Sequence, residues 1–108
     1  MNNYKVKCGS FEIANNKPFT LIAGPCQLES EDHAIKISTE LKKITSELKI
    51  NLIYKTSFDK ANRTSLKGKR GAGLEASLPI FDKLKKELNV PILTDIHNAE
   101  QCSPVAEH

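Results

Sequence analysis

The hydrophobic and polar positions of this chain alternate between strand-like and helix-like spacings. Weak two-residue alternation on either side of Gly9-Ser10 predicts a hairpin with strands over residues 4–8 and 11–14. Short apolar runs predict three buried strands, at residues 19–23, 52–56 and 91–94. Each of these strands is followed by a segment in which the apolar spacing changes to that of a helix.

The helical segments carry start signals and one apolar face each. Ser30 is a candidate N-cap, and the acids Glu31 and Asp32 suit the positive end of a helix. The apolar face of the first helix is expected to comprise Ala34, Ile37, Leu41, Ile44 and Leu48. That of the second is expected to comprise Leu74, Leu78, Phe81, Leu84 and Leu88. Pro79 is expected to bend the second helix or delay its start, and a short third helix is expected to begin near Asn98.

This order of elements predicts an α/β fold with a parallel sheet covered by helices. The strands start near residues 19, 52 and 91, a repeat of very roughly 35 residues that suits a (β/α)₈ barrel, which needs about 250 residues. Two architectures stay open for a single domain of 108 residues. One is a small open α/β sheet. The other is a truncated barrel, with the hairpin in residues 1–15 and the first three βα units in residues 16–108.

Composition excludes several classes of protein. The chain is 39% hydrophobic and 27% charged, which is ordinary for a folded domain. No apolar run is long enough to cross a membrane, and a net charge of +3 does not by itself indicate nucleic-acid binding. Cys8, Cys26 and Cys102 are an odd number at no disulfide-like spacing, so a reducing, cytoplasmic location is expected.

Positive charge is concentrated in one segment, residues 55–70, which follows the second predicted strand. Its six basic side chains are Lys55, Lys60, Arg63, Lys67, Lys69 and Arg70, against the single acid Asp59. A strand that leads into a cationic, hydroxyl-rich loop is typical of sites for phosphorylated small molecules. The alternative is an ordinary solvated face.

Polar residues follow every predicted parallel strand: Cys26 after the first, Lys55 at the second, and Asp95 with His97 after the third. Because the carboxyl ends of parallel strands meet at one edge of a sheet, we expect these groups to converge there. Taken singly, Cys26 is more often a small buried residue, and His97 could simply cap or pack.

Five segments resemble 3-deoxy-D-manno-octulosonate 8-phosphate synthases in order and spacing. They are AGPCQLES (23–30), YKTSFDKANRTS (54–65), RGAGLE (70–75), LTDIH (93–97) and PVAE (104–107). A related family that makes a seven-carbon sugar phosphate carries a KPRTS-like motif where this chain has KANRTS, so the difference favours the octulosonate family. The resemblance implies a homotetrameric, cytoplasmic (β/α)₈ barrel whose hairpin plugs the base.

The resemblance also implies a transferase reaction, in which phosphoenolpyruvate condenses with arabinose 5-phosphate and phosphate is released, for the lipopolysaccharide inner core. Lys55 and Lys60 would contact phosphoenolpyruvate. The residues that would hold arabinose 5-phosphate are Asn62, Arg63 and Thr64, and Ser57 is a further expected substrate-binding residue. Lys60, Asp95 and His97 would be the catalytic residues, with Asp95 meeting sugar hydroxyls. Nucleic acid and membranes are not expected partners.

Cys26 determines which class of the family the chain resembles. A metal-dependent class carries Cys at this position and a metal-independent class carries Asn, so a divalent ion (Zn, Fe or Mn) is expected on Cys26. The remaining ligands are expected after residue 108, so the 108-residue chain alone is expected to be inactive. Two alternatives stay open: the seven-carbon synthase, and a non-catalytic fragment that binds phosphate ligands.

Overall fold

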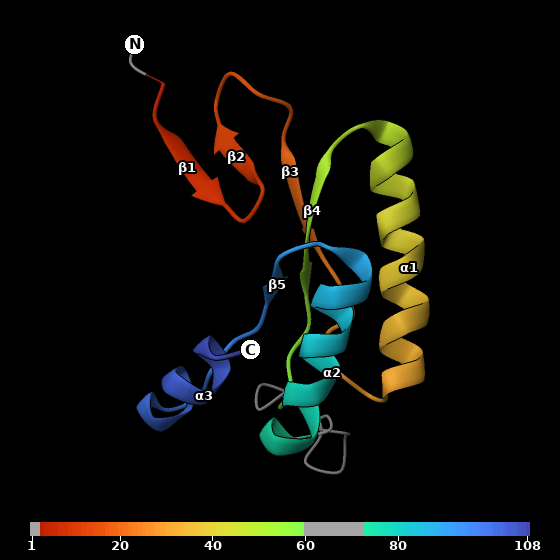
Figure 1. Cartoon of the computed structure of the whole chain (residues 1–108), viewed down its shortest axis with the longest axis vertical. Coiled ribbons are helices and arrows are strands. Elements are labelled where there is room, and N and C mark those ends of the chain that lie inside the picture. Colours follow the sequence, from red (N-terminus) through yellow and green to blue (C-terminus); the bar gives the residue numbers. More distant parts are fainter. Residues whose placement is uncertain (1–2, 60–72) are drawn as a thin grey trace.

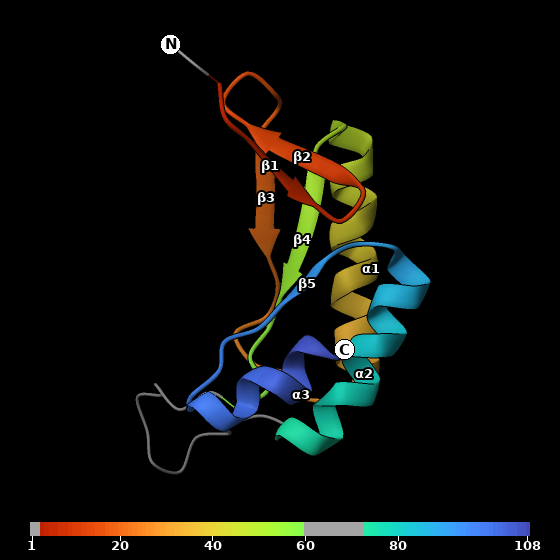
Figure 2. The same ribbon diagram turned by 60° about the vertical axis from the view of Figure 1, so that its left-hand side comes forward.

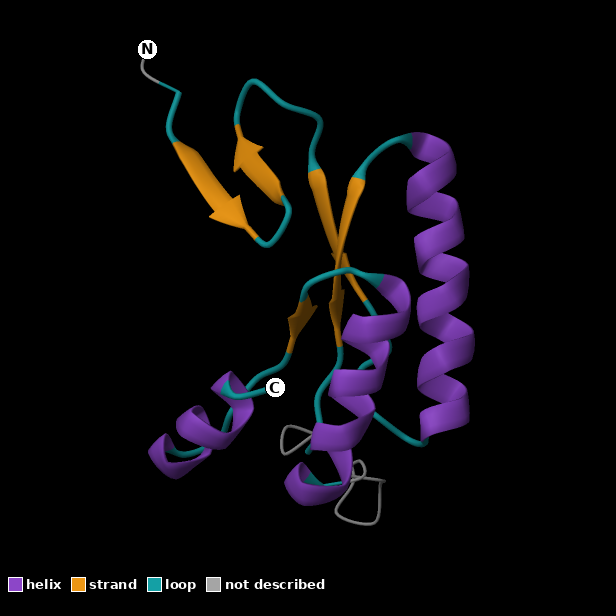
Figure 3. Cartoon of the chain, in the orientation of Figure 1, coloured by secondary structure: helices purple, strands orange, loops and turns teal. Residues whose placement is uncertain are grey.

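The computed structural model describes residues 3–59 and 73–108 of the chain. Within these residues, a two-stranded hairpin stands beside a three-stranded parallel sheet, and two long helices cover one face of that sheet (Figure 1). The mixed α/β architecture is therefore confirmed, and Figure 3 separates its helices from its strands. Of the described helices, none is both long and apolar enough to span a bilayer.

The hairpin consists of β1 (Lys5–Cys8) and β2 (Phe11–Ala14), as predicted. The antiparallel register pairs Cys8 with Phe11 across a two-residue turn, and Gly9 adopts φ 55°, which a glycine accommodates without strain. A side chain at Gly9 would lie 3.5 Å from the ring of Pro91, so the turn rests against the start of the third parallel strand. The hairpin thus lies at the end of the sheet where its strands begin (Figure 2).

The parallel sheet has the order β3-β4-β5. Its strands are β3 (Thr20–Ala23), β4 (Asn51–Lys55) and β5 (Ile92–Leu93). The strand β5 is shorter than the predicted 91–94 at both ends. Its later start follows from Pro91, which has no N–H and can only accept from Tyr54, at 3.0 Å. The prediction that residues 19–23 are buried was only partly right. Leu21 and Ala23 pack against the core, but Phe19 and Ile22 are exposed, since β3 is an edge strand of the described sheet.

The helix α1 (Glu31–Leu48) begins as predicted, with the Ser30 hydroxyl accepting from the His33 N–H at 3.1 Å. Its expected apolar face was only partly right. Ala34 is buried, but Ile44 and Leu48 are 45% and 64% exposed. The buried stripe instead runs through two hydroxyl residues, Ser38 and Thr45, which fit because each hydroxyl donates to a helix carbonyl.

The helix α2 (Leu74–Leu88) includes Pro79, and its start is not delayed as Pro79 led us to expect. Five helical residues precede the proline, and the Ser77 hydroxyl donates to the Gly73 carbonyl in the first turn. The turn η1 (Ala99–Gln101) and the helix α3 (Cys102–Ala106) follow Asn98, where a third helix was predicted.

The hydrophobic core lies between the sheet and the helices α1 and α2. It consists of Leu28, Ala34, Leu52, Tyr54, Phe58, Phe81, Leu84 and Val90. Because side chains alternate along a strand, Leu52 and Tyr54 enter this core while Ile53 and Lys55 face the opposite side of β4. That opposite face, called here the inner face, carries apolar groups towards the hairpin and polar groups towards the strand ends.

Candidate functional site

The carboxyl ends of the parallel strands lie at the end of the sheet away from the hairpin (Figures 1 and 2). This carboxyl edge is closely packed between the first two strands. A Cβ atom at Gly24 would lie 1.8 Å from the carbonyl oxygen of Lys55, so only glycine allows the two backbones to approach this closely. Beyond Gly24, Gln27 bridges to Ser57, and the Leu28 N–H donates to the Ser57 carbonyl at 2.8 Å.

The exposed thiol of Cys26 therefore stands at the carboxyl edge, one residue before Gln27. The alternative interpretation of Cys26 as a small buried residue is not met, because Cys26 is exposed. Within residues 3–59 and 73–108, no group of three or more His, Cys, Asp and Glu side chains is arranged to hold a metal ion. Cys26 could supply one ligand to a metal whose other ligands come from elsewhere.

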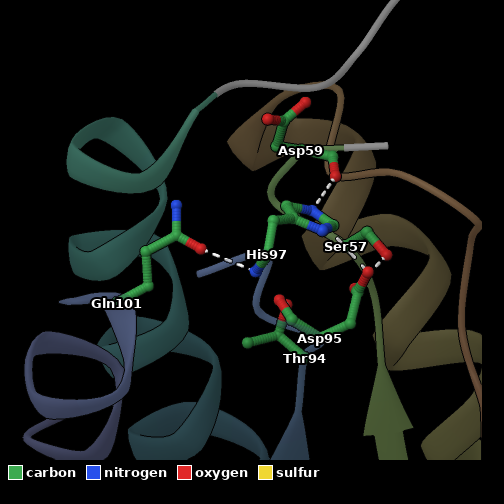
Figure 4. Close-up of polar contacts among 6 residues, drawn as sticks. All are labelled: Ser57, Asp59, Thr94, Asp95, His97 and Gln101. Carbon is green, nitrogen blue, oxygen red and sulfur yellow. Dashed lines mark hydrogen bonds and ion pairs between the residues drawn. The ribbon is translucent and has the colours of Figure 1, made fainter. Parts of the chain in front are cut away.

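Ser57 and Asp95 join the second and third strands at this edge. The buried Ser57 hydroxyl donates a hydrogen bond to the Asp95 carboxylate, across 38 residues of sequence (Figure 4). Partial burial raises the pKa of Asp95, but the Ser57 hydroxyl, the Asp95 backbone N–H and the charges of His97 and Lys55 outweigh it, so the pKa is lowered. Asp95 is thus an anion at neutral pH.

His97 lies beside this carboxylate. Its Nε2 is 3.7 Å from an Asp95 oxygen, and it also donates to the backbone carbonyl of Asp59 (Figure 4). The imidazole packs against the Phe58 ring, with centroids 5.7 Å apart and planes inclined by 59°. The sequence could not show that the acid–imidazole pair contacts the segment after β4.

The predicted convergence is confirmed for Lys55, Asp95 and His97, which gather at the carboxyl edge with Ser57, and the Lys55 charge acts on Asp95. The convergence of Cys26 with these groups stays a prediction, with Cys26 exposed at the same edge. The other predicted site residues, Lys60, Asn62, Arg63 and Thr64, lie outside the described residues. No role predicted for any of these residues is tested by the geometry alone.

One polar partner of His97 was not predicted from the sequence. The Gln101 side chain accepts from the His97 N–H at 2.8 Å. The available signal was its position: Gln101 is the third residue after Asn98, where a Gln side chain often reaches back to cap the start of a helix.

The carboxyl edge combines an ammonium, a hydroxyl, a carboxylate and an imidazole. A carboxylate fixed by a buried hydroxyl is a good acceptor for substrate hydroxyl groups. An ammonium next to it is suited to an anionic substrate, and the ring nitrogens of an imidazole can donate or accept hydrogen bonds. The set suits a polyhydroxylated anion more than an apolar ligand.

Comparison with known proteins agrees with this chemistry. Curated relatives named 2-dehydro-3-deoxyphosphooctonate aldolase match nearly the whole chain. The relative from Chelativorans sp. (strain BNC1) is 55% identical over 105 residues, 97% of this chain. Those from Mesorhizobium japonicum and Brucella ovis are 54% and 56% identical over 106 and 104 residues. The chain spans only 38% of the length of each of these relatives.

A family model extends the same agreement to residues 3–108, which include the hairpin, the parallel sheet and the carboxyl edge. The model is described as the DAHP synthetase I family. With a match over almost every residue, the chain belongs to the DAHP synthetase I family.

Proposed function

We propose that this chain is the N-terminal part of a 3-deoxy-D-manno-octulosonate 8-phosphate synthase. The enzyme would condense phosphoenolpyruvate with arabinose 5-phosphate, release phosphate, and supply a lipopolysaccharide precursor. The observation that carries the proposal is identity of 54–56% to relatives named 2-dehydro-3-deoxyphosphooctonate aldolase, over almost all of this chain. The lowered pKa of Asp95 and the basic segment supply independent chemical support.

In this proposal the carboxyl edge holds two polyanions, phosphoenolpyruvate and arabinose 5-phosphate. Lys55 binds phosphoenolpyruvate through its ammonium group. An ammonium within about 4 Å of an anion contributes roughly 4 kcal/mol of attraction at an effective dielectric constant of 20. Asp95, held by Ser57, accepts hydrogen bonds from hydroxyls of the sugar. His97 supports that carboxylate from its other oxygen, with Nε2 at 3.7 Å.

The basic segment is proposed to complete the site. Its residues from Lys60 onward lie outside the described residues. Lys60 would contact phosphoenolpyruvate near the bond-forming carbons, and Arg63 would grip the sugar phosphate with two parallel N–H donors. Asn62 and Thr64 would hold the sugar. These roles follow from the family motif YKTSFDKANRTS (residues 54–65) and stay proposals.

Cys26 is proposed as one ligand of a divalent Zn, Fe or Mn ion. Its thiol fits, because it is exposed and stands at the carboxyl edge beside Gln27. When bound, the ion would polarise the sugar aldehyde or a water molecule. The other ligands would come from the part of the family chain that corresponds to the remaining length of the relatives.

That remaining length also explains the exposed apolar groups. Phe19 and Ile22 on the edge strand, and Ile44 and Leu48 on α1, would be covered if the sheet continued into a (β/α)₈ barrel. A hydrophobic groove of about 550 Å³ between hairpin and sheet, lined by Tyr4 and Ile53 among others, would then be the base of the barrel. We propose this barrel, with a homotetrameric and cytoplasmic enzyme, as the complete form.

To test the proposed function, residues 1–108 are joined in frame to the remaining part of the Brucella ovis relative, giving what is called here the joined protein. The joined protein should release phosphate from phosphoenolpyruvate only when arabinose 5-phosphate is present, whereas the 108-residue chain should show negligible turnover. A folded joined protein that releases no phosphate would refute the proposed function. Measurable turnover by the chain alone would refute the view that it is an incomplete site.

A second candidate follows from the same incomplete site. The chain spans 38% of its relatives yet holds Lys55, Ser57 and Asp95 together, so it could bind phosphate ligands without turnover. Titration calorimetry of the chain with phosphoenolpyruvate separates this candidate from an inert fragment. Heat of binding without phosphate release favours it, and an absence of heat excludes it.

A further inference from the structure

The turn between β5 and α3 is closed by one side chain that has no assigned role. The Gln101 amide oxygen accepts from the His97 backbone N–H at 2.8 Å. In an ordinary capping box the third helical residue satisfies the N–H of the N-cap itself. Here Asn98 is the N-cap and its side chain makes no capping bond, so Gln101 reaches one residue further back, to His97.

The residue held in this way is the histidine of the candidate site. Figure 4 shows Gln101 on one side of the His97 backbone and the imidazole ring pointing away from it, between Asp59 and the Ser57–Asp95 pair. A backbone carbonyl can only accept, so the contact with the Asp59 carbonyl requires a proton on Nε2 of His97. The same Nε2 is 3.7 Å from the Asp95 carboxylate. The contacts of the ring therefore select its tautomer.

We propose that Gln101 is a positioning residue of this site. By holding the His97 N–H, it fixes the backbone from which the imidazole reaches the Asp59 carbonyl, and so keeps the ring protonated on Nε2 beside Asp95. The effect of Gln101 on the position of the ring does not depend on what the protein does. Only the consequence for turnover rests on the proposed function.

A purely structural role makes a different prediction. If Gln101 only closes the first turn of η1, its loss would loosen residues 98–106 and leave the imidazole unchanged. Substitution of Asn98, in the same turn, provides the matched control, because its side chain makes no capping bond. The two roles are separated by a measurement on the ring itself.

The experiment is nitrogen NMR of the His97 imidazole in the 108-residue chain. The parent should show the Nε2–H tautomer. The variant Gln101→Met, of similar length but without the acceptor, should show a mixture of tautomers, whereas Asn98→Ala should keep the parent spectrum. A parent ring protonated on Nδ1, or a Gln101→Met spectrum identical to that of the parent, would overturn the proposal.

A second variant covers the case in which Gln101→Met does not fold. Gln101→Glu keeps an acceptor oxygen and adds charge, so the hydrogen bond from His97 should strengthen and move the His97 amide proton downfield. An unmoved amide proton would contradict the hydrogen bond, and with it the proposal.

Activity of the joined protein supplies the catalytic readout. Gln101→Met should lower kcat/KM for arabinose 5-phosphate about two- to tenfold, the range expected for loss of one hydrogen bond, with KM for phosphoenolpyruvate unchanged. Gln101→Glu should recover most of the loss. If the joined protein with Gln101 intact is inactive, the proposed function fails, while the NMR result still decides the positioning role.

Discussion

The hydroxyl of Ser57 donates a hydrogen bond to the carboxylate of Asp95, and these residues are 38 positions apart in sequence. The contact ties the end of β4 to the segment after β5, next to the parallel pairing that holds these strands together. It also holds a partly buried carboxylate in its charged form, with help from His97 and Lys55. One hydrogen bond thus contributes both to the packing of these two segments and to the lowered pKa of Asp95.

Substitution Ser57→Ala should destabilise the fold by about 1 kcal/mol at pH 7, a value reduced from the usual range for charged hydrogen bonds because Asp95 is partly exposed. The pKa of Asp95 is lowered in the folded protein. Its contribution to the free energy of unfolding is therefore present above the pKa of about 4 that it has in the unfolded chain, and it is lost as the pH falls through the pKa of the folded state. Urea unfolding between pH 7 and pH 2 measures the difference.

The matched control for this prediction is Ser38→Ala. Ser38 is also buried, but its hydroxyl donates to the Ile35 carbonyl at 3.1 Å and contacts no carboxylate. Its effect should not change with pH. A Ser57→Ala effect that is equally constant with pH would contradict the role assigned to the hydrogen bond.

Tyr54 should titrate late and limit stability at high pH. The side chain is fully buried, its hydroxyl has no hydrogen-bond partner among the described residues, and burial raises its pKa to about 12. The pKa of a tyrosine in the unfolded chain is about 10. The free energy of unfolding should therefore keep its full value below pH 10 and fall by roughly 2 kcal/mol as the pH rises to about 12. Phenolate absorbance and unfolding at high pH measure both effects.

Tyr54→Phe should remove this pH-dependent loss and, at pH 7, should be neutral or stabilise by up to about 1 kcal/mol, since a buried hydroxyl without a described partner is lost. A marked destabilisation at pH 7 would show instead that the hydroxyl has a partner that matters to folding.

Gly24→Ala should disrupt the pairing of β3 with β4. The new Cβ would lie 1.8 Å from the Lys55 carbonyl oxygen, a backbone atom that cannot move without shifting the register, so a cost of about 3 kcal/mol or more is expected. At Gly73 a Cβ would meet no atom of the described residues within 4 Å, and the φ of 87° should cost only about 1 kcal/mol. Thermal unfolding compares the two, and equal losses would contradict the close approach at Gly24.

Substitutions in the exposed apolar stripe of α1, Ile44 and Leu48, should affect stability less than substitutions in the core. In the 108-residue chain, Leu48→Gln should change stability by less than about 0.5 kcal/mol, whereas Leu84→Ala, at 1% exposure, should cost about 2–5 kcal/mol. In the joined protein Leu48→Gln should cost clearly more, if a neighbouring helix of the barrel covers this stripe. The same small effect in both proteins would argue against the barrel.

Local patterns predicted most elements of the fold. The turn at Gly9-Ser10, the N-cap at Ser30 and the three-and-four spacing of α2 each depend on neighbouring residues alone. The buried side of α1 could not be found in the same way. Apolar spacing favoured Ile44 and Leu48, but the sheet packs against Ser38 and Thr45, whose hydroxyls are satisfied within the helix.

The candidate site was predictable to the extent that parallel strands bring their ends together. That rule identified Lys55, Asp95 and His97 as neighbours, but it could not predict which contacts they make with one another. The contacts themselves depend on tertiary packing: the Asp59 carbonyl approaches His97 only once the segment after β4 has folded beside β5. A backbone carbonyl leaves no signal in the sequence, and the Gln101 side chain leaves only its position.

The central claim is the proposal that residues 1–108 are the N-terminal part of an octulosonate phosphate synthase. Its most direct test is phosphate release by the joined protein, with phosphoenolpyruvate and either arabinose 5-phosphate or erythrose 4-phosphate as the aldehyde. We predict rapid release with arabinose 5-phosphate and little with erythrose 4-phosphate. A preference for erythrose 4-phosphate would contradict the claim and assign the chain to the seven-carbon branch of the family.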